Sequence, residues 1–280
     1  MRRTDIVFLG VLLGAASLAT RAAWAQTYFI DEGTDWTGNG CPADDLEEVT
    51  AELASMFDAS GFTGRRFANS SAWPQDLMES CSSKYGFRGL DSTYSDTADF
   101  VVVAGHGNTG FLAWGYKRED LCTVDLGKSS DLSSRGEARL GQMDGARASV
   151  GMWLTCCTLK KESLSAHANF QWLKQQLGFH GESDFNWHQP VEFIQNNAFE
   201  SNKQSWLDSM EDRPGWFTGS NSAIVVSYGK TSAEATDYHN NLATMRNVAF
   251  PRSGGPACTK GPPSFKYVYT LLDHGSDGCD

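Results

Sequence analysis

Two short apolar runs, each ending in a chemically reactive side chain, constrain the fold of this chain more than any other feature of its sequence. Residues 100–104 (Phe-Val-Val-Val-Ala) lead through Gly105 to His106, and residues 150–155 (Val-Gly-Met-Trp-Leu-Thr) lead to Cys156. Runs this short and apolar are typical of central strands in a parallel sheet. Because the carboxyl ends of parallel strands meet at one edge, the runs predict an imidazole and a thiol at the same edge.

The rest of the chain alternates between strand-like and helix-like patterns. We expect further strands at residues 27–30, 63–67, 111–114, 177–180, 223–227 and 265–272. We expect helices at residues 42–59, 74–79, 162–176 and 232–245, and a longer helix that begins at Pro190. This alternation predicts a single α/β domain over residues 26–280, a three-layer sandwich with a mostly parallel central sheet. Residues 117–147 are polar and show little periodicity, which predicts a long polar loop bordering the site.

The first 25 residues have the pattern of a secretory signal. Arg2 and Arg3 precede an apolar stretch at residues 6–19, and Ala-Trp-Ala at residues 23–25 is a small-x-small cleavage site before Gln26. We therefore expect a mature protein that is secreted or periplasmic. The apolar stretch is shorter than the roughly 20 residues of a membrane span, and no later stretch approaches that length, so we expect no membrane span.

Charge argues against nucleic acid as a partner. Removal of residues 1–25 takes away three arginines and one aspartate, which brings the net charge from −11 to −13. Phosphate binding requires a basic face. A solvated, exported protein suits this composition better.

The chain has seven cysteines, so at least one thiol stays unpaired in an oxidising compartment. Cys41 with Cys81 and Cys258 with Cys279 are candidate pairs, and Cys122 is a candidate partner for one residue of the Cys156–Cys157 pair. Connectivity cannot be deduced from the spacing alone.

His106 and Cys156 suit nucleophilic catalysis. A cysteine attacks as its thiolate, and an imidazole helps to form the thiolate and then donates a proton to the leaving group. Gly105 and Gly107 allow a sharp turn and close approach of a substrate, and the Gly107 amide is a candidate oxyanion donor. The alternative is that His106 is a structural residue in a glycine-rich turn.

Cys156 is favoured over Cys157 as the nucleophile, although Cys157 stays an alternative. Adjacent residues leaving a strand point in opposite directions, so one of the two at most faces His106. Small Thr155 precedes Cys156, and Leu159 can anchor the segment that follows. The alternative without catalysis is that both thiols are buried, or that one of them is in a disulfide.

For the other polar residues, the sequence gives less support for a role in the site. Asp99 and His180 are possible supporting residues of the site, whereas turn chemistry is the more ordinary role for an aspartate before a strand. We expect Asp76 on a solvated helix face, with a buttressing role as the alternative. The sequence has no His-Glu-x-x-His, Cys-x-x-Cys or Gly-x-Ser-x-Gly motif, so it predicts neither a metal nor a cofactor.

The order of an apolar strand with His-Gly, then an apolar strand with a small residue and Cys, resembles the caspase-like fold of clan CD cysteine peptidases. A closer resemblance, over much of the mature chain, is to a family of exported, caspase-like bacterial proteins. That resemblance is carried by Trp73-x-x-Asp76, by Asp96 and Asp99, by Gly105-His106-Gly107 and by Thr155-Cys156-Cys157-Thr158-Leu159. It implies that His106 and Cys156 form a catalytic dyad. The chain lacks the Gln-Ala-Cys-Arg-Gly sequence of caspases and carries a second cysteine after the first.

These observations predict an exported cysteine hydrolase, in the first place an endopeptidase that acts on a peptide or protein substrate. The alternative from another class is a catalytically silent caspase-like module that binds peptides or cell-surface ligands. A third hypothesis is a thiol hydrolase or transferase that does not cleave peptides.

Overall fold

The computed structural model describes residues 26–36, 41, 48–79, 88–126, 137–138, 140–141, 147–167, 173–181, 183, 188–211, 222–246 and 265–272. The predicted signal segment, residues 1–25, lies outside these ranges, as do Cys81, Cys258 and Cys279.

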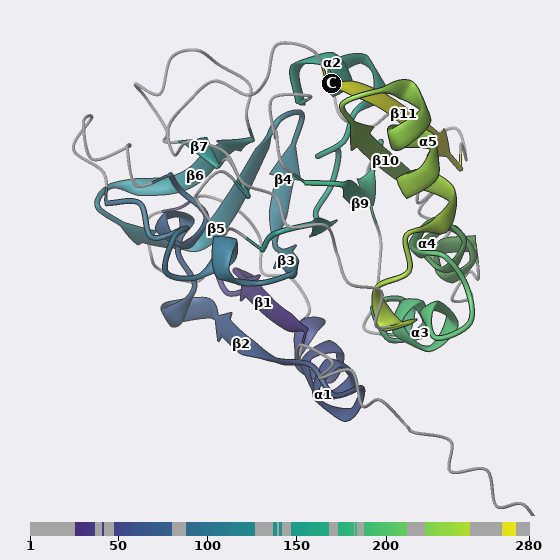
Figure 1. Cartoon of the computed structure of the whole chain (residues 1–280). Helices are drawn as coiled ribbons and strands as arrows, with labels where there is room; N and C mark the ends of the chain where they lie inside the picture. The colour runs from purple at the N-terminus through teal and green to yellow at the C-terminus, as the bar shows by residue number, and fades with distance from the viewer. Residues whose placement is uncertain are drawn as a thin grey trace, which may run out of the picture.

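A seven-stranded sheet forms the centre of the molecule (Figure 1). Its strands are β1 (Thr27–Glu32), β2 (Thr63–Ala68), β3 (Phe100–Ala104), β8 (Val150–Leu154), β9 (Gln175–Phe179), β10 (Ala223–Gly229) and β11 (Lys266–Leu271), in the order β11-β10-β9-β8-β3-β1-β2. Neighbours from β2 to β9 pair in parallel, and β10 pairs antiparallel with both β9 and β11. The prediction of a mostly parallel central sheet is therefore confirmed.

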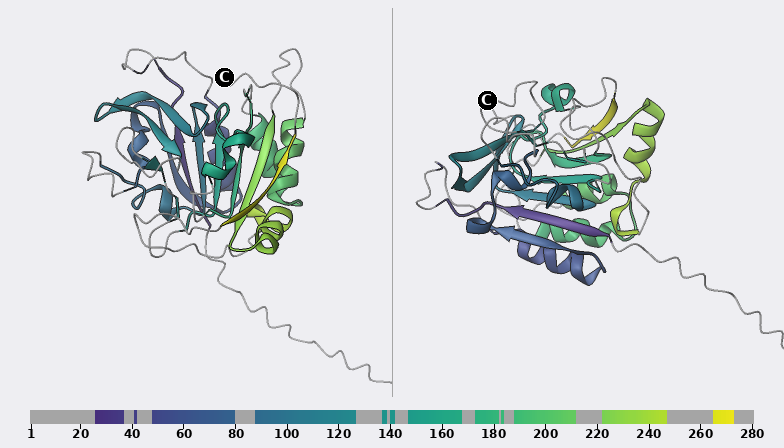
Figure 2. Two further views of the ribbon diagram at one scale, coloured as in Figure 1. Left: turned by 90° about the horizontal axis from the view of Figure 1, so that it is seen from above. Right: turned by 60° about the vertical axis from the view of Figure 1, so that its left-hand side comes forward.

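The two outer layers differ from each other. The helices α1 (Thr50–Ala59), α3 (His188–Asn197), α4 (Asn202–Glu211) and α5 (Ser232–Asn241) pack on one face of the central sheet (Figure 1). A second sheet of β4 (His106–Asn108), β5 (Phe111–Arg118), β6 (Leu121–Leu126) and β7 (Glu137–Ala138) covers the other face, as Figure 2 also shows. One outer layer is thus largely a small sheet rather than helices.

Short helical segments complete the described structure. They are the single α-turn α2 (Leu164–His167) and the 3-10 turns η1 (Asn69–Ser71), η2 (Pro74–Asp76), η4 (Ser95–Thr97), η5 (Lys161–Ser163) and η6 (Thr244–Arg246).

Alternation along β3 shows why its sequence is uniformly apolar. Phe100, Val102 and Ala104 face the helices, whereas Val101 and Val103 face the small sheet, and all five side chains are buried. Burial of each valine or phenylalanine side chain contributes about 1.5–3 kcal/mol, so both faces favour an unbroken apolar run.

The prediction of one long polar loop over residues 117–147 is wrong for its first ten residues. β5 extends to Arg118, and β6 follows after a two-residue turn. Leu121, Val124 and Leu126 are buried against the central sheet, with polar residues between them. Buried apolar residues with more exposed residues between them are typical of a sheet with one buried face.

The predicted helix at residues 162–176 is also too long at its end. β9 begins at Gln175, whose amide nitrogen Nε2 donates to Ser227 Oγ at 3.0 Å. Gln176 Oε1 accepts a hydrogen bond of 2.7 Å from Trp153 Nε1. These hydrogen bonds reduce the cost of burying two polar residues in a strand, and of the two amides only the Gln175 Oε1 has no partner in the described structure.

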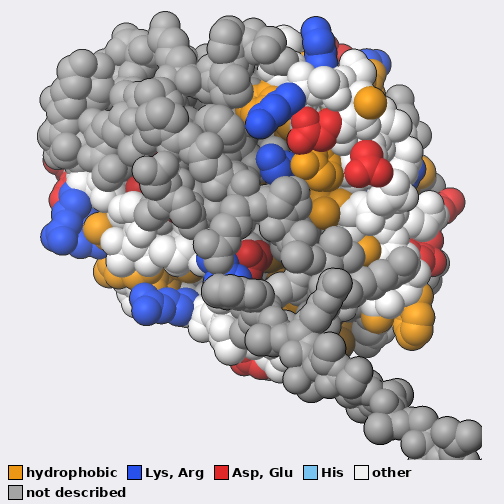
Figure 3. All heavy atoms as spheres, in the orientation of Figure 1, with side chains coloured by type: hydrophobic (Ala, Val, Ile, Leu, Met, Phe, Trp, Pro, Cys, Tyr) orange, Lys and Arg blue, Asp and Glu red, His pale blue; other side chains and the backbone are white. Residues whose placement is uncertain are grey.

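The surface seen in Figure 3 carries charges of both signs, interspersed with hydrophobic side chains. A continuous basic face of the kind that binds phosphate is not seen in the described part of this view. Among the described residues, no helix is both long and apolar enough to cross a membrane.

Candidate active site

Strand pairing brings the segments that carry His106 and Cys156 side by side. β3 and β8 are adjacent and parallel, and Ala104 lies opposite Leu154 at their carboxyl ends. The Gly105 N–H continues the ladder by donating to the Leu154 carbonyl at 3.2 Å. Beyond this point one chain enters β4 at His106 and the other enters a turn at Cys156. The two residues therefore follow neighbouring strands at the same edge of the sheet.

Gly107 packs directly against the cysteine turn. A Cβ atom at this position would lie 2.8 Å from Thr155 Cβ, 2.8 Å from Thr158 Oγ1 and 2.9 Å from the carbonyl oxygen of Cys156. Contacts under 3.0 Å are too short for a real Cβ atom. The close approach of the two segments thus depends on the missing side chain at Gly107.

The two glycines beside His106 differ in the use of their amides. The Gly105 N–H is committed to Leu154 and is not available to a substrate oxyanion. Gly107 lies opposite Leu112 in the β4–β5 hairpin, one pair beyond the closing pair Asn108–Phe111. Antiparallel ladders alternate bonded and non-bonded pairs, so the Gly107 N–H faces away from β5, at the open edge of β4.

Cys156 and Cys157 are in different chemical states. Cys156 is a free thiol and is partly exposed. Cys157 is 3% exposed and disulfide-bonded, with a partner outside the described residues. Its φ of 57° turns the chain sharply after Cys156. A disulfide removes Cys157 as a nucleophile in this oxidised state and leaves Cys156 as the candidate.

The sulfur of Cys156 contacts three atoms of Ser183. Sγ lies 3.4 Å from Ser183 N, 3.4 Å from Ser183 Oγ and 3.7 Å from Ser183 O. These are all the hydrogen-bond contacts of Sγ among the described residues, and His106 is not one of the partners.

The ring of His106 packs against Trp36. The two ring centroids are 4.9 Å apart with an interplanar angle of 72°, an edge-to-face contact. Trp36 is 6% exposed, and its Nε1 donates to the Gly33 carbonyl at 3.1 Å. A contact of this kind holds the imidazole in place from the side of β1.

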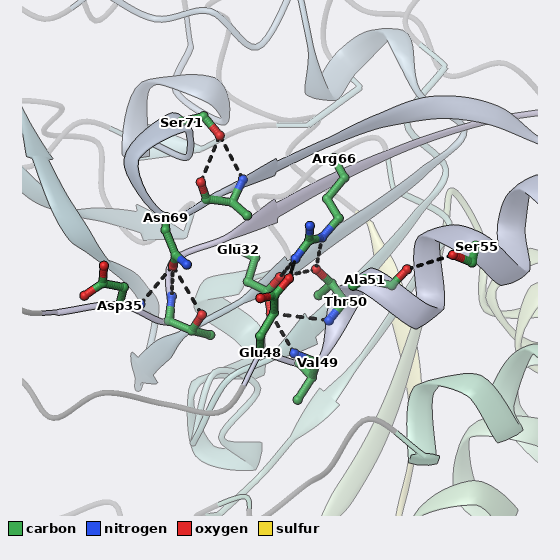
Figure 4. A network of polar contacts seen from close by, with 12 residues as sticks. Glu32, Asp35, Glu48, Val49, Thr50, Ala51, Ser55, Arg66, Asn69 and Ser71 are labelled. Atoms are coloured by element: carbon green, nitrogen blue, oxygen red, sulfur yellow. Dashed lines mark hydrogen bonds and ion pairs between the residues drawn. The ribbon is translucent and has the colours of Figure 1, made fainter.

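The segment that carries Trp36 is anchored at both ends. Asn69 Oδ1 accepts hydrogen bonds from the backbone N–H groups of Thr34 at 3.1 Å and Asp35 at 2.9 Å (Figure 4). Beyond Trp36, a disulfide joins Cys41 to Cys122 on β6. The candidate pair Cys41–Cys81 is therefore not the one formed.

The carboxyl end of β1, just before this segment, is fixed by Glu32. Its Oε1 accepts from the N–H groups of Val49 at 2.8 Å and Thr50 at 3.3 Å, where α1 begins (Figure 4). Its Oε2 forms an ion pair of 2.6 Å with Arg66 of β2, and Arg66 also pairs with Glu48. A carboxylate at a helix N-terminus is favourable because it satisfies free N–H groups there.

His180 lies at the same edge and holds the chain after the cysteines. It is 7% exposed, and its Nδ1 accepts a hydrogen bond of 2.9 Å from the Lys161 N–H. Two backbone bonds run beside it, from Cys157 N to Gly181 O at 2.8 Å and from Leu159 N to Phe179 O at 3.0 Å. The geometry gives His180 a structural part in the cysteine turn.

Asp99, the other supporting residue suggested by the sequence, does not lie beside His106. It precedes β3, whereas His106 follows it, and five residues of strand separate the ends by about 17 Å. Its carboxylate accepts from Thr27 N at 2.7 Å and forms an ion pair with Arg147, whose Nε lies 3.0 Å from Oδ1. Asp99 thus fastens the opposite edge of the sheet.

Two buried aspartates lie beneath the small sheet. Asp31 on β1 accepts a hydrogen bond of 3.1 Å from Trp114 Nε1, and Asp76 accepts one of 3.1 Å from Trp73 N. Both are fully buried, and the Oδ1 atom of each has no hydrogen-bond partner in the described structure. The expectation that Asp76 lies on a solvated helix face is therefore wrong.

Burial changes the acid–base behaviour of this pair. Burial raises the pKa of Asp76 to about 7, against the opposing effects of the Trp73 N–H and the positive charge of Arg118. Burial and the nearby Asp76 carboxylate raise the pKa of Asp31 well above its ordinary value. At least part of the population therefore carries a proton on this pair near neutral pH.

Ser183 and Trp36 are the site residues that sequence reasoning missed. Trp36 comes from a segment without periodicity, and no motif marks it. Ser183 follows β9 and Gly181, so a strand end at this edge was the available signal. Within the described ranges, no group of three or more His, Cys, Asp or Glu side chains is placed to hold a metal ion.

Comparison with known proteins places the site inside a family domain. No curated protein matches the chain. Residues 34–248 match a family described as a domain of unknown function, DUF6345. This span includes Trp36, His106, Cys156 and Ser183 and covers more than half of the sequence. The chain therefore belongs to the DUF6345 family.

Proposed function

We propose that this protein is an exported cysteine hydrolase of the caspase-like type, and most specifically an endopeptidase. The observation that carries the proposal is the free, partly exposed thiol of Cys156, which follows β8, beside the strand β3 that leads to His106. Adjacent parallel strands deliver a nucleophile and a base to one edge, as nucleophilic catalysis requires. The Cys41–Cys122 disulfide supports an oxidising compartment.

In the proposed reaction, Cys156 Sγ attacks the carbonyl carbon of a peptide bond, and His106 takes the thiol proton. The tetrahedral oxyanion then collapses to a thioester as His106 gives the proton to the leaving amine. Water, activated by His106, hydrolyses the thioester and restores the thiol. The outward-facing Gly107 N–H supplies one hydrogen bond to the oxyanion.

The imidazole and the thiol do not share a hydrogen bond in this structure. Catalytic contacts are often longer in the absence of substrate and tighten when it binds. The proposal therefore includes an approach of the His106 ring to Sγ on substrate binding.

A peptide-cleavage assay tests the proposal. The mature wild type is incubated with casein and with mixed internally quenched peptides, beside the variants Cys156→Ala and His106→Asn. Exposed His188→Gln serves as the control for His106→Asn. We expect turnover by the wild type and the control, and a loss of about 10³-fold or more in both site variants. Equal turnover by Cys156→Ala would show that Cys156 is not the nucleophile.

A catalytically silent binding module is the second candidate. The absence of a His106–Sγ hydrogen bond among the described residues favours it. A wild-type protein that binds peptides from the same mixture but cleaves none, even at high enzyme concentration, would decide for this candidate.

A further inference from the structure

The contacts of the Cys156 sulfur assign a role to a residue outside the His–Cys pair. Ser183 presents two hydrogen-bond donors to Sγ, its backbone N–H and its hydroxyl, each with the heavy atom 3.4 Å from the sulfur. The Ser183 carbonyl oxygen, 3.7 Å away, is placed to accept from the thiol when sulfur is protonated. One residue can therefore serve both protonation states of this sulfur.

The two donors matter most when the sulfur is charged. Hydrogen bonds to an ionised partner are stronger than those between neutral groups. In the described structure, no basic side chain and no other backbone N–H is within hydrogen-bond distance of Sγ. Stabilisation of a thiolate in the resting protein therefore falls to Ser183.

The backbone before Ser183 is held against the cysteine turn at three points. Cys157 N donates to Gly181 O, Leu159 N donates to Phe179 O, and Lys161 N donates to His180 Nδ1, all at 2.8–3.0 Å. These bonds tie the chain that follows β9 to the chain that follows β8 as far as two residues before Ser183. Donors whose position is fixed in advance stabilise charge at a lower cost in reorganisation.

We propose that Ser183 is a catalytic residue that stabilises the thiolate of Cys156 through its N–H and hydroxyl groups. This inference rests on the proposed function, because a stabilised thiolate is of use to a nucleophile. It gives Ser183 the charge-stabilising task in the resting protein, and it leaves His106 the transfer of protons once substrate is bound.

The rate of alkylation of Cys156 by iodoacetamide tests the inference. The rate is measured from pH 5 to pH 9, and peptide mass analysis confirms that Cys156 is the modified residue. The set comprises the wild type, Ser183→Ala, Ser183→Thr and the control Ser163→Ala, whose native hydroxyl donates to the Lys160 carbonyl at 2.8 Å rather than to Sγ. Thermal unfolding checks that each variant is folded.

We expect Ser183→Ala to react about tenfold more slowly than the wild type near neutral pH, since it loses one hydrogen bond to a charged acceptor. Its pH–rate profile should move toward alkaline pH. Ser183→Thr, which keeps both donors, should restore most of the rate, and Ser163→Ala should match the wild type. An unchanged rate in Ser183→Ala would overturn the inference, and a faster rate would show that Ser183 merely covers the sulfur.

The alkylation assay separates this inference from the proposed reaction. If alkylation slows in Ser183→Ala but the wild type cleaves no peptide, Ser183 stabilises the thiolate and the endopeptidase assignment fails. If the wild type cleaves peptides through Cys156 but alkylation is the same in Ser183→Ala, the endopeptidase assignment stands and the inference about Ser183 fails.

Discussion

Replacement of Asp76 by asparagine tests how a fully buried carboxyl group is accommodated in the core. Asparagine has nearly the same shape, and its Oδ1 can keep the hydrogen bond from Trp73 N. Its NH₂ group takes the place of the Oδ1 atom of Asp76, which has no partner among the described residues. The change therefore removes a charge at little cost in packing.

The expected effect depends on pH because the pKa of Asp76 is raised from 3.8 to about 7 in the folded protein. Between these values the folded protein keeps a proton that the unfolded chain releases. The contribution of Asp76 to stability is thus fully present below about pH 4 and is lost as pH rises to 7. A difference of about three pH units corresponds to about 4 kcal/mol in the free energy of unfolding.

Urea unfolding of the wild type and Asp76→Asn at pH 4.5, 5.5, 6.5 and 7.5 measures this contribution. Relative to the wild type, Asp76→Asn should gain stability as pH rises, with the largest difference, several kcal/mol, at pH 7.5. Removal of the Asp76 charge also takes away one of the effects that raise the pKa of Asp31, which adds to the gain at high pH. Exposed Asp237→Asn is the control and should show no such trend. A stability difference that is constant across this range would refute the reasoning.

Three further perturbations test other parts of the structure. Burial lowers the pKa of His239 to about 4, so the free energy of unfolding should fall by about 3 kcal/mol as pH drops from 6.5 to 4. In urea unfolding, His239→Gln should lose less of its stability over this pH range than the wild type. Gly107→Ala must displace the cysteine turn, so it should lower the melting temperature and change the iodoacetamide rate of Cys156. In urea unfolding, the double variant Cys41→Ser with Cys122→Ser should lose about 2–5 kcal/mol of the free energy of unfolding. A loss below about 1 kcal/mol would show that the segment carrying Trp36 is held in place without the disulfide.

The inner strands of the central sheet were predictable because they are buried on both faces. The β3 and β8 sequences contain no charged residue, and an apolar run of only about five residues is typical of a buried strand rather than of a helix. The ends of elements were less predictable where polar residues are buried. Gln175 and Gln176 look helical or exposed in sequence, and only their partners Ser227 and Trp153 explain why they lie inside a strand.

Only the site residues that directly follow regular strands were predictable. His106 and Cys156 follow regular strands, so the rule for parallel sheets places them at one edge. Trp36 and Ser183 come from segments whose positions depend on long-range contacts, such as those of Asn69 and Gly181. Asp76 was misjudged because ionisable residues are rarely fully buried, and its raised pKa is the physical price of that position.

The pairing of β1, β3 and β8 determines when the site can form during folding. Tyr28 lies opposite Phe100, and Phe100 lies opposite Val150, so each contact closes a long stretch of chain. Closure of such loops lowers the chain entropy before the native contacts can form and offset this cost. Sheets with many such contacts therefore fold slowly. Until β8 docks beside β3, the thiol of Cys156 is open to exchange with the other six cysteines. Refolding yield should therefore depend on the redox buffer, because Cys156 must stay unpaired while Cys41 and Cys122 pair and the adjacent Cys157 forms its disulfide.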